Sequence, residues 1–216
     1  MNAKFVVYVI DADAGFRRDL VLVLRKKGFQ PVPFSSGPDF LDSLDFLQSG
    51  IVLLELHMPG MDGIEVQERL LERRVDMPVI IMARDAELQT AVQAIKKGAT
   101  DFIEKPFTFA LLMEMLDSAI GQLDKQTEVQ SRRDDAASRV NHLSARELDV
   151  MHGLLAGLTN KALARELNLS PRTVEMHRAN MMKKIGVKKL SEAIQIAMDA
   201  EINSPFASNG QVAHHR

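Results

Sequence analysis

Residues 158–190 are rich in lysine and arginine, with eight basic residues and only two acidic ones, Glu166 and Glu175. The bases are Lys161, Arg165, Arg172, Arg178, Lys183, Lys184, Lys188 and Lys189. Residues 1–124 have the opposite balance, with 13 Lys and Arg against 19 Asp and Glu. A compact basic segment beside an acidic region is typical of a surface that binds a polyanion, although a solvated helix face has the same composition.

The chain offers no residue set that predicts an enzyme or a cofactor. It lacks a nucleophile with a neighbouring base, a glycine-rich phosphate loop and a cluster of metal ligands, and we expect His57 to be a surface loop residue. The absence of cysteine excludes disulfides and thiolate metal sites. No apolar run approaches the roughly 18 residues of a membrane span, and the first ten residues do not resemble a signal peptide. We therefore expect a cytoplasmic protein.

The basic residues fall within a predicted series of short helices. Ser144 and Glu147 have the spacing of a capping box, which begins the first helix. A second, short helix begins at Thr159 or Asn160. The turn at 168–171 ends in a serine that caps a third helix and a proline that occupies its first position.

The third predicted helix has two distinct faces. Its core stripe, at spacings of three and four, is Val174, His177, Met181 and Ile185. The opposite face carries Arg172, Glu175, Met176, Arg178, Ala179, Met182 and Lys183. The DNA major groove admits one such helix, which reads bases with its N-terminal turns. We expect Ser191 to cap a fourth helix.

The first half of the sequence alternates short apolar runs with helical periodicity. The predicted strands are 5–10, 30–35, 51–56, 79–83 and 101–103, and the predicted helices are 15–27, 38–48, 64–74, 86–97 and a last one from Thr108. This alternation indicates an α/β fold, with helices on both faces of a parallel sheet. The functional crevice of such a sheet lies at the carboxyl ends of its strands.

A polar stretch separates the two halves, and we interpret it as a partly helical linker. The predicted organisation is a first domain over 1–123, this linker over 124–140, a helical domain over 141–202 and a frayed tail over 203–216. The two halves are therefore analysed as separate folding units.

Three blocks of the second half carry a family resemblance. They are Leu143-Ser-Ala-Arg-Glu-Leu, Gly157-Leu-Thr-Asn-Lys-Ala-Leu-Ala and Leu169-Ser-Pro-Arg-Thr-Val-Glu-Met-His-Arg-Ala-Asn. Together they resemble the LuxR-type helix-turn-helix, and the last is especially similar to the FixJ branch of the NarL/FixJ response regulators. The resemblance implies an all-α four-helix domain, a recognition helix in the major groove, and dimers on inverted half-sites that meet through the fourth helix.

The resemblance also assigns residues to the DNA. Glu175, Met176 and Ala179 are implied to face bases. The Glu175 carboxylate can accept a hydrogen bond from cytosine, or it is a solvated residue with no effect on base reading. The residues implied to contact phosphate are Lys161, Arg172, Thr173, Arg178 and Asn180. His177 belongs to the same block, but its place on the inner stripe favours a core or supporting role.

Three stretches of the first half carry a second resemblance. They are Tyr8-Val-Ile-Asp, Leu54-Glu-Leu-His-Met-Pro-Gly-Met-Asp-Gly and Lys97-Gly-Ala-Thr-Asp-Phe-Ile-Glu-Lys-Pro-Phe. They resemble the response-regulator receiver, which implies a flavodoxin-like sheet of five parallel strands in the order 2-1-3-4-5. Receivers transfer a phosphoryl group from histidine to an aspartate after the third strand. A pair of acids holds Mg²⁺, and a hydroxyl and a lysine bind the phosphoryl oxygens.

Three positions of this phosphorylation site depart from the receiver pattern. The acceptor position is Glu55, the second of the paired acids is Ala12, and the position of the switch hydroxyl is Ala83. The residues that match the pattern are Asp11, Lys105 and the switch aromatic Phe102. The resemblance therefore implies a receiver fold with a degenerate site.

Each departure removes a different part of the chemistry. Ala12 supplies no Mg²⁺ ligand, and Asp13 replaces it only if the loop bends. The extra methylene of Glu55 displaces its carboxylate by about 1 Å, which can cost about a hundredfold in a positioned reaction. Ala83 has no hydroxyl for a phosphoryl oxygen. We therefore expect no phosphorylation of Glu55 and weak or no Mg²⁺ binding, which argues against a cognate histidine kinase as partner.

Two interpretations of Glu55 stay open. Its longer reach can bring the carboxylate to Lys105 and imitate part of the phosphorylated state, or the domain is a scaffold that only dimerises or docks. The surface that such receivers use for dimers includes Val92, Ile95 and Phe102 here.

These observations predict a sequence-specific transcriptional regulator with a receiver that acts without aspartyl phosphorylation. The alternative is a conventional response regulator with an unusual acceptor, Glu55 or Asp13. The expected partners are double-stranded promoter DNA and a second copy of the chain, with RNA polymerase as a further candidate and no membrane. RNA is disfavoured because its deep, narrow groove excludes a helix.

Overall fold

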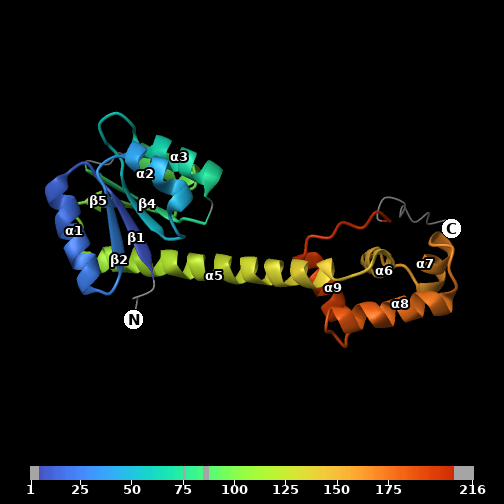
Figure 1. Ribbon diagram of the computed structural model, residues 1–216. Helices are drawn as coiled ribbons and strands as arrows, with labels where there is room; N and C mark the ends of the chain where they lie inside the picture. The colour runs from blue at the N-terminus through green and yellow to red at the C-terminus, as the bar shows by residue number, and fades with distance from the viewer. Residues whose placement is uncertain (1–4, 75, 85–87, 207–216) are drawn as a thin grey trace. The chain divides into compact units, whose positions relative to one another are not determined.

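A computed structural model describes residues 5–74, 76–84 and 88–206 (Figure 1). Contacts divide the chain into two units, Met1–Thr127 and Glu128–Arg216. Within the described residues, no helix is both long and apolar enough to cross a membrane. Residues 86–87 of the fourth predicted helix and residues 207–216 of the predicted tail lie outside the described residues.

A five-stranded parallel sheet forms the centre of the first unit. Its strands are β1 (Val6–Ile10), β2 (Gln30–Phe34), β3 (Ile51–Glu55), β4 (Val79–Arg84) and β5 (Asp101–Lys105). Their order, β2-β1-β3-β4-β5, confirms the prediction. Strand β2 contains Pro31 and Pro33 and lies at an edge, where a missing backbone donor is tolerated. Since all strands are parallel, their carboxyl ends share one edge of the sheet.

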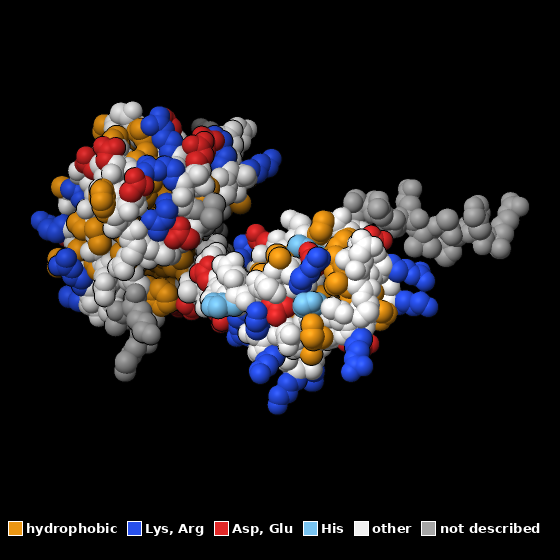
Figure 2. All heavy atoms as spheres, turned by 45° about the vertical axis from the view of Figure 1, so that its right-hand side comes forward, with side chains coloured by type: hydrophobic (Ala, Val, Ile, Leu, Met, Phe, Trp, Pro, Cys, Tyr) orange, Lys and Arg blue, Asp and Glu red, His pale blue; other side chains and the backbone are white. Residues whose placement is uncertain are grey.

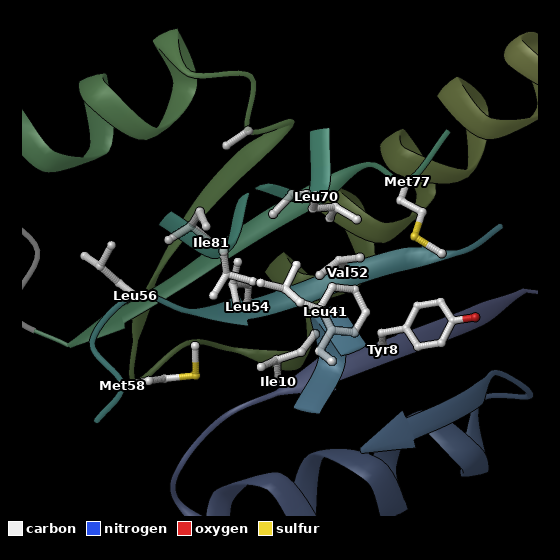
Figure 3. Close-up of a cluster of buried hydrophobic side chains, with 14 of the residues drawn as sticks. Tyr8, Ile10, Leu41, Val52, Leu54, Leu56, Met58, Leu70, Met77 and Ile81 are labelled. Carbon is white, nitrogen blue, oxygen red and sulfur yellow. The ribbon is translucent and has the colours of Figure 1, made fainter. Parts of the chain in front are cut away.

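Strand side chains alternate between two hydrophobic cores, as the period of two requires. In β1, Tyr8 and Ile10 face one core and Val7 and Val9 face the other. Helices α2 (Gly37–Ser43), α3 (Gly63–Arg73) and α4 (Leu88–Lys96) and the 3-10 helix η1 (Leu44–Phe46) cover the first core. Helices α1 (Ala14–Lys26) and α5 (Phe109–Asn141) cover the second. Figure 3 shows the first core. Its close packing holds the strands in position, and with them the charged residues at their carboxyl ends.

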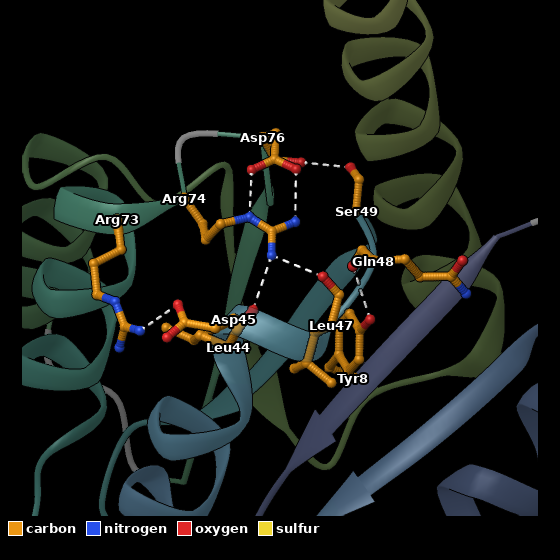
Figure 4. Close-up of polar contacts among 9 residues, drawn as sticks. All are labelled: Tyr8, Leu44, Asp45, Leu47, Gln48, Ser49, Arg73, Arg74 and Asp76. Atoms are coloured by element: carbon orange, nitrogen blue, oxygen red, sulfur yellow. Dashed lines mark hydrogen bonds and ion pairs between the residues drawn. The ribbon is translucent and has the colours of Figure 1, made fainter.

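At the amino-terminal ends of the strands, a hydrogen-bond network around Arg74 stabilises the neighbouring loops (Figure 4). Its guanidinium donates two hydrogen bonds of 2.8 Å to the Asp76 carboxylate. It also donates to the carbonyls of Leu44 and Leu47, at 3.0 and 2.8 Å. The network therefore fastens the loop before β3 to the loop before β4, at the end of the sheet opposite to the crevice.

Helix α5 continues through the segment that we expected to be a linker. Ala136 is buried and Val140 packs against the core of the second unit. Asp135 and Arg139 form an i,i+4 ion pair of 2.8 Å, which supports the helix despite its polar composition. The structure thus differs from the predicted domain limits, because residues 128–140 belong to the second unit.

The secondary structure of the second unit is helical over its described residues, 128–206. Its other helices are α6 (Ala145–Leu155), α7 (Asn160–Glu166), α8 (Pro171–Lys184) and α9 (Leu190–Asp199). A Cβ on Gly153 would lie 2.6 Å from the Leu163 side chain, so the glycine lets this leucine pack closely where α6 meets α7. The prediction that Ser191 caps the fourth helix is wrong. Lys189 is the N-cap, because the Glu192 carboxylate accepts the backbone N–H groups of residues 188 and 189.

Candidate functional sites

A shallow pocket opens at the carboxyl edge of the sheet, as expected for this topology. It is lined by Asp11, Ala12, Asp13, Glu55, His57 and Arg84. Asp11 follows β1, and Glu55 and Arg84 end β3 and β4. A Cβ on Gly63 would lie 2.4 Å from the Glu55 carbonyl oxygen, so only a glycine lets α3 begin this close to the pocket.

Three buried charged side chains lie together at the base of the pocket. Lys105 Nζ is 2.6 Å from Asp11 Oδ2 and forms a second ion pair with Glu55 Oε2. All three side chains are at most 8 % exposed. This contact between Glu55 and Lys105 was expected from the greater length of the glutamate side chain. Removal of the lysine would leave two buried carboxylates without a counter-charge, and removal of both carboxylates would leave a buried lysine without one.

An aromatic side chain also contacts Lys105. Its Nζ lies 4.0 Å from the centre of the Phe16 ring, which in turn packs edge-on against Phe107. Burial lowers the pKa of Lys105, and the hydrogen bond to Asp11 opposes that shift. Lys105 is therefore held by two carboxylates and a ring. This role of Phe16 was not predicted from the sequence, where the only signal was an aromatic residue at the start of an amphipathic helix.

Asp13 is bound on both of its oxygens. Its Oδ1 accepts the backbone N–H groups of Gly15 and Phe16, at 2.9 and 3.0 Å, and so caps α1. Its Oδ2 accepts a hydrogen bond of 2.8 Å from Arg84. This role of Arg84 was not predicted, although a basic residue directly after Ala83, beside an acidic pocket, was a usable signal in the sequence.

The pocket does not fit the Mg²⁺ site that the receiver resemblance implies. Asp11 Oδ1 accepts the N–H of Asp13 at 2.8 Å, and Asp11 Oδ2 binds Lys105. Glu55 binds the same lysine, and Ala12 has no carboxylate. Within the described parts of the chain, no group of three or more His, Cys, Asp or Glu side chains is arranged to hold a metal ion.

Ala83 and Phe102 do not line this pocket, whereas His57 lies at its surface. Ala83 is fully buried in the first core, and Phe102 is half-buried against the same core. The His57 side chain is 67 % exposed and lies 3.6 Å from Asp62, which agrees with the surface position expected for it. Ala83 thus places a methyl group where a receiver presents its hydroxyl.

Helices α7 and α8 meet at a tight turn. Asn168 takes the left-handed φ of 54°, and the N–H of Leu169 donates to the carbonyl of Ala164 at 2.8 Å. The Ser170 hydroxyl accepts the N–H of Thr173 at 3.1 Å, and proline occupies the first helical position. The cap predicted for this helix is therefore confirmed, and the half-buried Thr173 is part of it.

The outer face of α8 combines exposed polar, charged and apolar side chains. Val174, Met181 and Ile185 are buried on its inner side, as predicted. The exposed residues are Arg172, Glu175, Met176, Ala179, Asn180 and Lys183, with Lys161 exposed on α7. Figure 2 shows lysine and arginine side chains at several places around the outer surface of the C-terminal unit. This arrangement agrees with a helix that enters a DNA groove.

Two residues of α8 lie between its two faces. Arg178 is half-buried and donates to the Asn160 side chain at 3.3 Å, which links α8 to the start of α7. His177 is also half-buried rather than part of the core proper, so the stripe predicted for α8 is interrupted at this residue. The supporting contact of Arg178 with Asn160 was not predicted from the sequence.

An ion pair between a buried glutamate and an exposed lysine fixes the far end of α8. Glu147 Oε2 accepts a hydrogen bond of 2.7 Å from Lys184 and also accepts from the N–H and hydroxyl of Ser144. Burial raises the pKa of the Glu147 carboxyl, but these hydrogen bonds outweigh it and lower the pKa from 4.5 to about 2. The predicted capping box is present, and it has the added function of orienting α8 against α6.

Comparisons with known proteins agree with both resemblances. The family model for the response regulator receiver domain matches residues 7–117, and the model for bacterial regulatory proteins of the luxR family matches residues 141–197. The chain is 43% identical to the transcriptional regulatory protein FixJ of Bradyrhizobium diazoefficiens, over 93% of this chain and 98% of the relative. It is 34% identical to FixJ of Rhizobium meliloti, over 90% and 95%.

Two solved structures are similar over most of their length. Full-length FixJ from B. japonicum has a TM-score of 0.57 at 43% identity, covering 92% of this chain and 98% of that one. The response regulator StyR has a TM-score of 0.76 at 30% identity, covering 89% and 98%.

Proposed function

Since this chain belongs to the NarL/FixJ family of response regulators, and is thus a DNA-binding transcriptional regulator of the two-component type, we propose that its receiver acts without aspartyl phosphorylation. One observation carries the proposal. Asp11, Glu55 and Lys105 are joined in buried ion pairs at the position where a receiver accepts its phosphoryl group. The carboxylate at the acceptor position and the lysine of the pocket are thereby already in contact with each other.

Phosphoryl transfer depends on positioning and on charge stabilisation. Here the carboxylate at the acceptor position is bound to Lys105, the residue that in receivers contacts the phosphoryl oxygens. A nucleophilic attack by Glu55 would have to break that buried pair, and position 83 offers no hydroxyl that could bind a phosphoryl oxygen. For the same reasons we propose that the protein needs no Mg²⁺ and no cognate histidine kinase.

The paired Glu55 and Lys105 also favour an active-like receiver over a passive scaffold. A phosphorylated aspartate places negative charge against the lysine, and the longer glutamate places its own charge there. We propose that this standing pair keeps the receiver in one state. The regulator would then respond to its own abundance rather than to a phosphoryl donor.

The output is sequence-specific DNA binding through α8. Glu175, Met176 and Ala179 are exposed on its outer face and are proposed to read bases. Lys161, Arg172 and Asn180 are exposed around them, and with Arg178 they are proposed to contact phosphates. His177 and Thr173 support the helix rather than the readout.

Self-association is proposed to place two such helices on inverted half-sites. Exposed apolar side chains on α4 and α5 offer a surface for it, since Val92 is 44%, Ile95 46% and Leu111 41% exposed. Sedimentation of the full chain should therefore detect dimers. A strictly monomeric chain at high concentration would contradict this part of the proposal.

Intact-mass measurement tests the central proposal. The wild-type chain is incubated with acetyl phosphate and Mg²⁺ and is expected to keep its mass. Glu55→Asp alone should also stay unmodified, because Ala12 and Ala83 still lack their functional groups. A stoichiometric gain of one phosphoryl group by the wild type would overturn the proposal. Glu55→Gln and Asp13→Asn would then identify the unusual acceptor of a conventional regulator.

A further inference from the structure

Arg84 lies at the rim of the pocket, at the end of β4, and contacts a residue that follows β1. Its Nη2 is 2.8 Å from Asp13 Oδ2. In the strand order, β3 separates β1 from β4. The ion pair therefore spans the carboxyl end of β3, which is the strand end that carries Glu55.

The ion pairs of the pocket form two layers. In the buried layer, Lys105 contacts both Asp11 and Glu55, so one net negative charge remains there. In the outer layer, Arg84 compensates Asp13, and their side chains are 60% and 45% exposed. Asp13, the third carboxylate of the pocket, is thus also bound to a cationic side chain of the same protein.

We propose that the Arg84 guanidinium serves as a built-in cation of the pocket, which binds Asp13 and excludes divalent metal ions. This inference rests on the proposed function, because it explains how a receiver that does without phosphorylation also does without Mg²⁺. Arg84 is a positioning residue in this role. It holds the start of α1 to the end of β4 over Glu55.

The coordination chemistry of Mg²⁺ agrees with this role. The ion requires near-octahedral oxygen ligands and loses its water reluctantly, so it needs free carboxylate oxygens. Asp13 Oδ1 is committed to the backbone of α1, and only Oδ2 is available to a cation. Arg84 binds that oxygen, and its fixed positive charge repels cations that approach from solvent.

Binding of Mn²⁺, a spin-active substitute for Mg²⁺, provides the test. The free ion is followed by electron paramagnetic resonance while the full chain is titrated. Arg84→Ala should bind Mn²⁺ about tenfold more tightly than wild type, the factor for removing a unit charge about 6 Å from a divalent ion in a water-like dielectric. Arg84→Lys keeps the charge and should resemble wild type. The matched control Arg69→Ala, which removes an exposed, ion-paired arginine from α3, should also resemble wild type.

Three results would overturn the role of Arg84. They are equal Mn²⁺ affinity of wild type and Arg84→Ala, an equal gain in Arg69→Ala, and a gain in Arg84→Lys as large as in Arg84→Ala. The proposed function is tested apart from this by the mass of wild type after acetyl phosphate. A modified wild type with unchanged Arg84 behaviour contradicts phosphorylation independence, whereas an unmodified wild type with no effect of Arg84→Ala contradicts only the role of the arginine.

Discussion

Charged side chains at the carboxyl edge of the sheet have their partners inside the protein, whereas several on the outer side of the helix-turn-helix do not. Lys105 binds Asp11 and Glu55, and Arg84 binds Asp13. By contrast, Lys161, Arg172 and Lys183 have no side-chain partner among the described residues. A region whose charges are internally paired keeps its structure without a ligand, and one with exposed, unpaired cations is ready for an external polyanion.

The first way to break this comparison is to unpair the pocket. Lys105→Met leaves Asp11 and Glu55 buried without a cation and should lower the free energy of unfolding of the first unit by about 3–5 kcal/mol. Urea unfolding is followed by the fluorescence of Tyr8, which is the only tyrosine in a chain without tryptophan. Lys97→Met, which removes an exposed lysine paired with Glu68, is the control and should change stability by less than about 0.5 kcal/mol. If Lys105→Met lowered the free energy of unfolding by less than about 1 kcal/mol, the buried ion pairs of the pocket would contribute no more to stability than an exposed ion pair.

The second test asks whether the C-terminal unit also depends on one internal pair. Glu147→Gln should lower its free energy of unfolding by about 1.5–3 kcal/mol at neutral pH, because a charged hydrogen-bond acceptor for Lys184 and Ser144 is lost. Hydrogen exchange of α6 amides measures the effect locally, with the exposed Glu166→Gln on α7 as control.

The lowered pKa of Glu147 gives this second test a pH dependence. The folded pKa is about 2 and the ordinary value is 4.5, so the stabilisation is fully present above about pH 4.5. The difference between wild type and Glu147→Gln should shrink as the pH falls from 4.5 towards 2. A difference that is constant over this range would contradict the ion-pair explanation.

The third test concerns base reading by the exposed face. Glu175→Ala should change the base preference at one position of each half-site, with a discrimination of about 1–3 kcal/mol. Binding-site selection with both proteins measures it. Identical selected motifs would show that Glu175 is only a solvated acid, which would sharpen the comparison by restricting readout to Met176 and Ala179.

The smallest expected effect concerns phosphate contacts. Arg172→Ala should weaken binding to all sequences and reduce the salt slope by about one unit. Arg178→Ala should do the same and also loosen α7, because it loses the contact to Asn160. Arg146→Ala on α6, where the arginine pairs with Asp149, is the control. An unchanged slope in Arg172→Ala would remove this residue from the DNA contact.

The strand order, the helix-turn-helix and the Glu55–Lys105 contact were predictable from the sequence. Parallel strands bring their carboxyl ends together, and Ser170-Pro171 fixes the start of α8 by local chemistry. Arg84 and Phe16 were missed because their partners come from other strands and helices. The extent of α5 was missed because a polar composition does not reveal a buried Ala136, and the N-cap of α9 depends on the reach of Glu192 rather than on a serine.

The most direct test of phosphorylation independence is a DNA-binding titration of the full chain on its selected site, with and without acetyl phosphate and Mg²⁺. The account predicts the same binding midpoint in both conditions and an unmodified mass. A change in midpoint of about fivefold or more, the lower end of usual allosteric coupling, together with a gain of one phosphoryl group, would contradict it.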